Sequence, residues 1–126
     1  MTIEEHPVVI RFMRDGKEAI DVIRPASSPI FAAALQNTTR VNLGSIQVEV
    51  PRVEMALALK FASMISLTLR VKDRYIDAHD FIGLVQHSRT LDQQKLIAFG
   101  EIVYAGGGAE ITKMVDDARA GRQLAL

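Results

Sequence analysis

The chain has 126 residues, enough for one domain that buries roughly two thirds of its unfolded surface, and we expect a single domain over residues 1–126. Its 48% hydrophobic and 24% charged residues exclude a disordered chain. Fifteen basic and fifteen acidic residues cancel, so composition gives no strong nucleic-acid signal. The absence of cysteine excludes disulfides and thiolate metal sites.

The N-terminal stretch MTIEEHP is acidic and lacks the basic-then-apolar order of a signal peptide. The longest apolar stretch, residues 57–69, is interrupted by Lys60, Ser63 and Ser66, and it falls short of the ~20 residues that span a bilayer. We therefore expect a cytoplasmic protein that does not enter membranes.

Residues 8–50 read as strands with one short helix. Asp15 and Gly16 lie between two β-prone runs, which indicates a hairpin because both central residues of a type I′ turn need φ above zero. With that turn, Phe12 pairs with Ala19 and Ile10 pairs with Asp21.

A second hairpin follows a short helix that Ser28 and Pro29 begin and that ends near Asn37. Its turn is Gly44–Ser45, and the resulting register pairs residues of matching kind. The expected pairs are Val41 with Val48, Asn42 with Gln47, and Arg40 with Glu49.

Residues 53–121 read as helices. We expect an almost wholly apolar helix over 53–70, and further helices over about 74–87, from a Thr90–Gln93 capping box to Tyr104, and from Ala109 to Gly121. The expected fold class is α+β, with a small mixed or antiparallel sheet of two hairpins (about 8–50) packed against a helical C-terminal half (about 53–121).

Lys60 is a candidate site residue because it lies among alanine, leucine and methionine. Burying an ammonium there is costly unless an anion meets it. Together with Ser63, Ser66 and Arg70 it forms one narrow polar stripe on its helix. Either Lys60 takes part in a site, or its stem reaches water past Ser63.

Two other clusters have structural alternatives. Asp73, Asp77 and Asp80 share one helix face and could hold a hard cation, but acidic residues near a helix start more often cover an outer face. The Gly106–Gly108 stretch follows a helix rather than a strand, so it indicates a helix–helix turn more than a phosphate loop.

Asp21 is the second candidate, a lone carboxylate in the apolar strand stretch EAIDVIR. Such strands seldom place a charge in mid-run without a reason. Either Asp21 faces water or it serves chemistry. An aspartate on a strand and a lysine on a helix of one small fold suggest a site for metal and phosphate.

The order of these motifs resembles the second half of small bacterial nucleotidyltransferase-fold proteins, the polymerase-β-like superfamily that includes abortive-infection type toxins. The resemblance covers roughly residues 8–87. The matching residues are Asp21, then Glu54 and Lys60, then Arg70, Lys72 and Asp73, then Asp77 and Asp80.

The resemblance implies that Asp21 is the third carboxylate of a catalytic magnesium site and that Lys60 lies near the nucleotide phosphates or supports the site from behind. The reaction would be metal-assisted phosphoryl transfer. Nothing upstream of Val8 matches the family's Gly-Ser loop and Asp-x-Asp pair, so Asp21 could hold metal only with additional carboxylates.

We therefore expect a truncated nucleotidyltransferase-like protein that is not catalytic alone and that acts through binding, as a homodimer or with a partner chain that completes the fold. Alternatively, it is half of a magnesium-dependent enzyme whose glycine loop and Asp pair come from another chain. A third reading is a plain α+β domain in which Asp21 and Lys60 are exposed.

Overall fold

The structure is a computed structural model, and it describes residues 2–5, 9–23, 28–66 and 70–126. Within the N-terminal strands, the side chains of residues 4, 5, 9–12 and 18–23 lie outside the described part. The fold combines five helices with two antiparallel sheets in these residues, which confirms the α+β class.

The first hairpin belongs to a three-stranded sheet in the order β1-β2-β3, formed by Thr2–Glu5, Val9–Arg14 and Lys17–Ile23. Its turn is Asp15–Gly16, as predicted, and both residues have positive φ. The predicted register is wrong beyond the turn. A β-bulge makes Phe12 face Ile20, so that Asp21 faces Arg11 rather than Ile10.

The second hairpin, β4 (Thr38–Leu43) and β5 (Ile46–Pro51), forms a separate two-stranded sheet that we call the ribbon. All three predicted residue pairs are confirmed. Helix α1 (Pro29–Gln36) precedes it and begins after Ser28, as predicted, although the Ser28 side chain makes no capping hydrogen bond. Asn37 anchors the base of the ribbon, because its carbonyl accepts a 3.0 Å bond from the Arg52 N–H.

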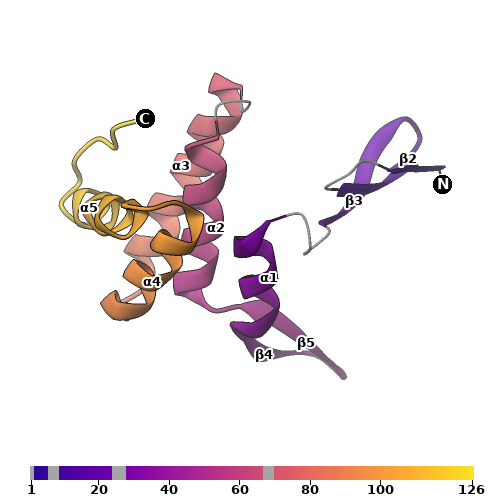
Figure 1. Cartoon of the computed structure of the whole chain (residues 1–126). Helices are drawn as coiled ribbons and strands as arrows, with labels where there is room; N and C mark the ends of the chain where they lie inside the picture. Colours follow the sequence, from indigo (N-terminus) through magenta and orange to yellow (C-terminus); the bar gives the residue numbers. More distant parts are fainter. Residues whose placement is uncertain (1, 6–8, 24–27, 67–69) are drawn as a thin grey trace.

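The two hairpins were expected to form one sheet against the helices, and this arrangement is wrong. Figure 1 shows the β1-β2-β3 sheet lying apart from the helices at the upper right, while the ribbon extends from the ends of α1 and α2 at the lower right. The first hairpin pairs with β1 instead of with the second hairpin, and α1 lies between the two hairpins in chain order.

The remaining chain forms α2 (Val53–Met64), α3 (Val71–Gln86), α4 (Gln93–Val103) and α5 (Gly107–Arg119). Helix α2 is shorter than predicted, and Arg70 is the N-cap of α3 rather than a member of the α2 stripe. Helix α4 is capped by Asp92, whose carboxylate accepts from the Lys95 N–H at 3.2 Å, and not by Thr90.

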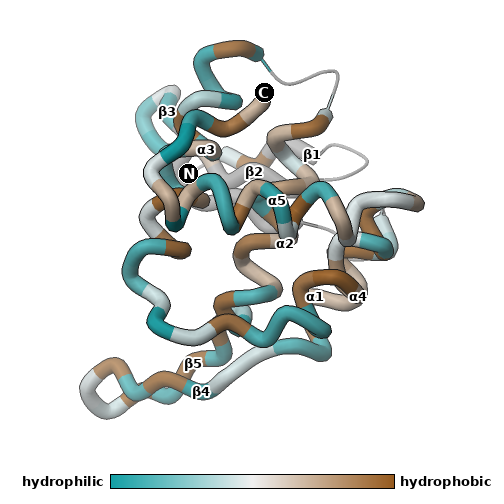
Figure 2. Tube along the Cα trace, turned by 90° about the vertical axis from the view of Figure 1, so that its left-hand side faces the viewer, coloured by the Kyte–Doolittle hydropathy of each residue, from teal (hydrophilic) through white to brown (hydrophobic). Residues whose placement is uncertain are grey.

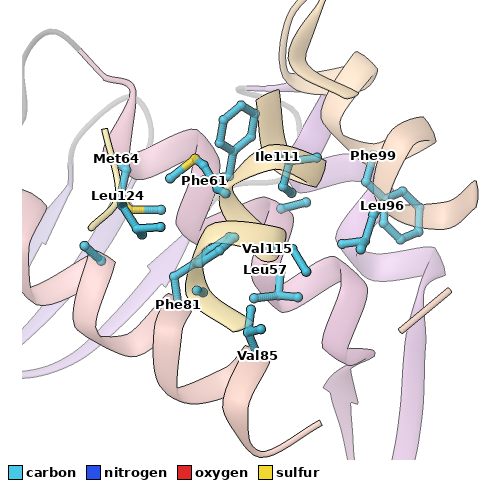
Figure 3. Close-up of a cluster of buried hydrophobic side chains, with 14 of the residues drawn as sticks. Leu57, Phe61, Met64, Phe81, Val85, Leu96, Phe99, Ile111, Val115 and Leu124 are labelled. Carbon is cyan, nitrogen blue, oxygen red and sulfur yellow. The ribbon is translucent and has the colours of Figure 1, made fainter. Parts of the chain in front are cut away.

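The hydrophobic core lies between α2, α3, α4 and α5, with contributions from α1 and the C-terminal segment (Figure 3). Helix α2 is the central one, which explains why its sequence is apolar on nearly every side. The largest core side chains with almost no exposed surface are those of Met55, Leu57, Phe61, Phe81, Val85, Leu96 and Ile111.

Helices α4 and α5 meet where glycines allow their backbones to touch. A Cβ on Gly100 would lie 2.6 Å from the Gly107 carbonyl oxygen, closer than any side chain tolerates. Gly106 has φ of +96° and turns the chain between the two helices. The glycine stretch is therefore a helix–helix turn, as predicted, although α5 begins at Gly107 and not at Ala109.

The residues after α5 fold back over the helices. Gly121 has φ of +71° and ends the helix, as predicted. The Asp117 carboxylate, whose side chain is 9% exposed, pairs with Lys113 and Arg122 at 2.9 Å each. These contacts lower the pKa of Asp117 below its usual range, and they hold the segment that places Leu124 in the core.

Candidate functional site

Lys60 lies where α2 faces α3, and it is held by two carboxylates. Its Nζ is 3.3 Å from Asp77 Oδ1 and 3.0 Å from Asp80 Oδ2. Ser63, one turn further along α2, donates its hydroxyl to Asp77 Oδ2 at 2.6 Å. We call these four residues the Lys60 cluster.

The sequence positions explain this geometry. Lys60 and Ser63 are three residues apart on α2, and Asp77 and Asp80 are three apart on α3, so each pair lies on one helix face. The sequence favoured an outer solvated face for these aspartates, and this expectation is wrong for Asp77. Its side chain points inward and is only 16% exposed, whereas Asp80 stays 47% exposed.

Lys60 keeps 35% of its side chain exposed, so it is neither fully buried nor free in water. Burial by itself lowers the pKa of Lys60, but the hydrogen bonds to Asp80 and Asp77 and their negative charges outweigh burial and raise it above 10.5. The ammonium is charged, and two carboxylates compete with any anion for it.

The Lys60 cluster borders two hollows. One, of about 460 Å³, lies between α1, α2 and α3 and is lined on its polar side by Ser28, Ser63 and Asp77, with the Phe31 ring as an apolar wall. The other, of about 500 Å³, runs along the outer side of α3 past Asp80. The first hollow has the mixed apolar and polar lining of a small-molecule site.

The structure does not place the Asp21 side chain, which lies outside the described residues. Its backbone belongs to β3 of the three-stranded sheet, whereas Lys60 belongs to α2. The predicted joint role of Asp21 and Lys60 therefore stays a prediction. Asp73, the third aspartate of α3, is separate from the Lys60 cluster and pairs with Arg70 at 3.1 Å.

No group of three or more histidine, aspartate or glutamate side chains within the described residues has the arrangement of a metal site. The backbone N–H groups of the glycine turn before α5 already bind a carboxylate of the same chain. Glu101 accepts hydrogen bonds from the N–H groups of Gly106 at 3.0 Å and Gly108 at 3.2 Å. These are donors that a phosphate would otherwise use.

The ribbon carries a surface that sequence reasoning missed. Cross-strand partners share a face, so Val41, Leu43, Ile46, Val48 and Val50 all lie on one side. Figure 2 shows the ribbon projecting beyond the helices, with brown hydrophobic positions alternating with teal ones. Leu43 is 62% exposed and Ile46 is 63% exposed. The alternation was visible in the sequence, but only the structure shows that nothing in the described chain covers the tip of this face.

The opposite face of the ribbon is polar. Arg40 pairs with Glu49 at 3.7 Å, and Asn42 lies opposite Gln47. A two-stranded hairpin alone is marginally stable in water, and one apolar face without a covering layer increases that difficulty. We call the side with the five aliphatic residues the apolar ribbon face.

Comparisons with protein-family models, with curated protein sequences and with solved structures each found no match to this chain. Among the helices in the described residues, none combines the length and apolarity needed to cross a bilayer. The Lys60 cluster and the apolar ribbon face are therefore the two surfaces from which function is inferred.

Proposed function

We propose that this chain is a nucleotidyltransferase-like binding unit that acts by assembling with another copy of itself through the apolar ribbon face. The observation that carries the proposal is the exposure of Leu43 and Ile46 at the tip of a two-stranded ribbon. Such a surface is stabilised when a second layer covers it, as in any sheet packing.

The ribbon also provides hydrogen-bonding edges in a form that suits self-association. In the part of the chain that the structure describes, each ribbon strand has one neighbour, so the other side of its backbone is available for another strand. The side chains on the polar face already pair across the ribbon, and a second copy can cover the apolar face without disturbing them.

Apolar burial at the ribbon tip supplies part of the ~8 kcal/mol that micromolar association requires, and backbone pairing at the ribbon edges would add to it. Burying the exposed parts of Leu43 and Ile46 in both copies contributes about 4–6 kcal/mol, at about 2 kcal/mol for each fully buried aliphatic side chain. The half-buried Val48 and Val50 add to this. Ordering and association entropy oppose it, so we expect a reversible complex rather than a permanent one.

The test is the mass in solution by light scattering, from about 1 to 100 µM, around the micromolar affinities of weak complexes. The wild type should have at least twice the chain mass of 13.9 kDa. The variant Leu43→Lys/Ile46→Glu should have a lower mass than the wild type at the same concentration, because it removes apolar surface while keeping an attractive cross-strand pair.

The matched control is Asn42→Lys/Gln47→Glu, which introduces the same two charges on the neighbouring rung of the polar face. It should associate like the wild type. A wild type that has the mass of one chain throughout this range contradicts the proposal, and so does equal dissociation of the two variants.

A second candidate function is nucleotide binding as half of a magnesium-dependent nucleotidyltransferase, favoured by the 460 Å³ hollow beside Lys60, Ser63 and Asp77. Here Lys60 would support the site from behind through Asp77, since its ammonium is already paired. Asp21 would contribute one magnesium ligand, with further carboxylates from another chain.

This second function is tested by titrating nucleoside triphosphates with magnesium, alone and with a chain that supplies a glycine loop and an Asp pair. Transfer should appear only in the mixture, and Asp21→Ala should abolish it. Transfer that is unaffected by Asp21→Ala would exclude the assigned role.

A further inference from the structure

The outer face of α3 contains a glycine that the chain itself does not need. Gly83 lies in the interior of α3, where glycine is less favourable than alanine. A Cβ added there would meet no heavy atom within 4 Å, and its backbone φ is ordinary. Among the described residues, neither packing nor backbone geometry accounts for it.

Gly83 lines the 500 Å³ hollow that runs along α3, together with His79 and Asp80, and Lys60 of α2 borders the same hollow. Ile76 lies seven residues before it, two helical turns away on the same face, and is 51% exposed. One helix face therefore presents an exposed aliphatic side chain, a histidine and aspartate at its centre, and a hollow.

We propose that this face of α3, from Ile76 to Gly83, is a pairing surface for the same face of a second copy, with the two helices antiparallel. In that register Ile76 of each copy enters the hollow at Gly83 of the other. His79 of each copy then lies opposite Asp80 of the other.

Hydrogen bonding and shape select this occupant and this direction. An antiparallel pair centred between residues 79 and 80 places each histidine beside the Asp80 carboxylate, which pairs with Lys60 of its own chain at 3.0 Å and is still 47% exposed, so that it can accept a further hydrogen bond. A parallel pair would place Asp80 against Asp80 and Ile76 against Ile76, leaving both hollows empty. A surface that complements itself in shape and charge is the mark of a two-fold interface.

The α3 surface is distinct from the ribbon, so this proposal does not rest on the proposed function. Two different two-fold surfaces on one chain can generate a tetramer, a common assembly with mutually perpendicular axes. Removing either surface should leave a dimer through the other, so the failure of one proposal is separable from the failure of the other.

The first test uses disulfide cross-linking, since the chain has no cysteine. Ile76→Cys and Gly83→Cys are each introduced into the Leu43→Lys/Ile46→Glu background and oxidised alone or mixed. The mixture should give a disulfide-linked dimer of the two variants, because antiparallel pairing brings these positions together. Cross-linking of Ile76→Cys mainly with itself, or no excess in the mixture, overturns the proposal.

The second test moves the large aliphatic side chain from position 76 to position 83, in the same background. Ile76→Ala and Gly83→Ile should each weaken dimerisation about ten-fold or more, the first by losing buried methyl groups and the second by filling the hollow. The double variant Ile76→Ala/Gly83→Ile should recover most of the affinity. Single variants with the dimerisation constant of the background would contradict the register. So would a double variant whose loss of affinity equals the sum of the two single losses.

Ile76→Ala and Gly83→Ile each improve helix propensity at their own position, so a folding defect does not imitate the loss. Ala98→Ile on α4, an exposed position outside this face, is the matched control for added aliphatic surface. It should leave the dimerisation constant unchanged, and a comparable loss there would show that the effect is not specific to α3.

Discussion

The two helix-interior glycines Gly100 and Gly83 should respond to the same substitution with opposite signs. Alanine at either position gains about 1 kcal/mol of helix propensity over glycine. At Gly100 the new Cβ lies 2.6 Å from the Gly107 carbonyl oxygen and 2.8 Å from the Gly108 nitrogen, and all of these neighbours are backbone. Helices α4 and α5 must therefore separate by about 0.6–0.8 Å to reach ordinary contact distance.

Such overpacking typically costs about 1–3 kcal/mol, and losing tight contacts along the helix pair favours the upper part of that range. Gly100→Ala should thus lower the free energy of unfolding by about 1–2 kcal/mol after the propensity gain. Gly83→Ala should raise it by about 0.5–1 kcal/mol, because its Cβ meets nothing within the chain.

Both variants are compared by urea denaturation, followed by circular dichroism at 222 nm, in a chain that also carries Ile76→Lys and Leu43→Lys/Ile46→Glu. That background removes both the α3 pairing and the ribbon pairing, so the difference reports on the fold alone. The reasoning is refuted if Gly100→Ala is as stable as Gly83→Ala, because the close approach of α4 and α5 would then not constrain the backbone.

The other predictions concern the charged residues. Lys60→Met should lower the unfolding free energy by about 1 kcal/mol, since it leaves the half-buried Asp77 with one partner while solvent screens part of the loss. In denaturant titrations this Lys60 contribution should be present below pH 10.5 and fade as pH rises through the raised pKa in the fold. Asp117→Asn should remove a contribution that is present above pH 3.8 and is lost as pH falls through the lowered pKa in the fold, so the two proteins should converge in stability at acid pH. Glu101→Gln should destabilise the turn before α5 at neutral pH, which amide hydrogen exchange at Gly106 and Gly108 would report; unchanged exchange contradicts the capping role.

The sequence was sufficient for features that short segments determine. Asp15–Gly16 and Gly44–Ser45 specify their turns through local backbone chemistry, and the ribbon register follows from residues of matching kind. The bulge opposite Phe12 was not predictable. Both strands are largely apolar there, so the order of apolar and polar residues does not show that one strand holds an extra residue.

Contacts between distant segments were beyond sequence reasoning. Lys60 could be recognised as needing an anion, but only the packing of α2 against α3 identifies Asp77 and Asp80 as its partners. Likewise, helix periodicity places aspartates on one face of α3 without saying which way that face points. The ribbon shows the same limit, because alternation predicts an apolar face but not whether the chain covers it.

Assembly through the ribbon is the central claim, and amide hydrogen exchange in residues 38–51 tests it most directly. A two-stranded hairpin without a covering layer opens readily and should exchange almost as fast as an unfolded peptide. The account predicts strong protection of these amides at about 100 µM that fades on dilution below about 1 µM and is absent in Leu43→Lys/Ile46→Glu. Protection that is the same at every concentration, or equally weak at all of them, would contradict it.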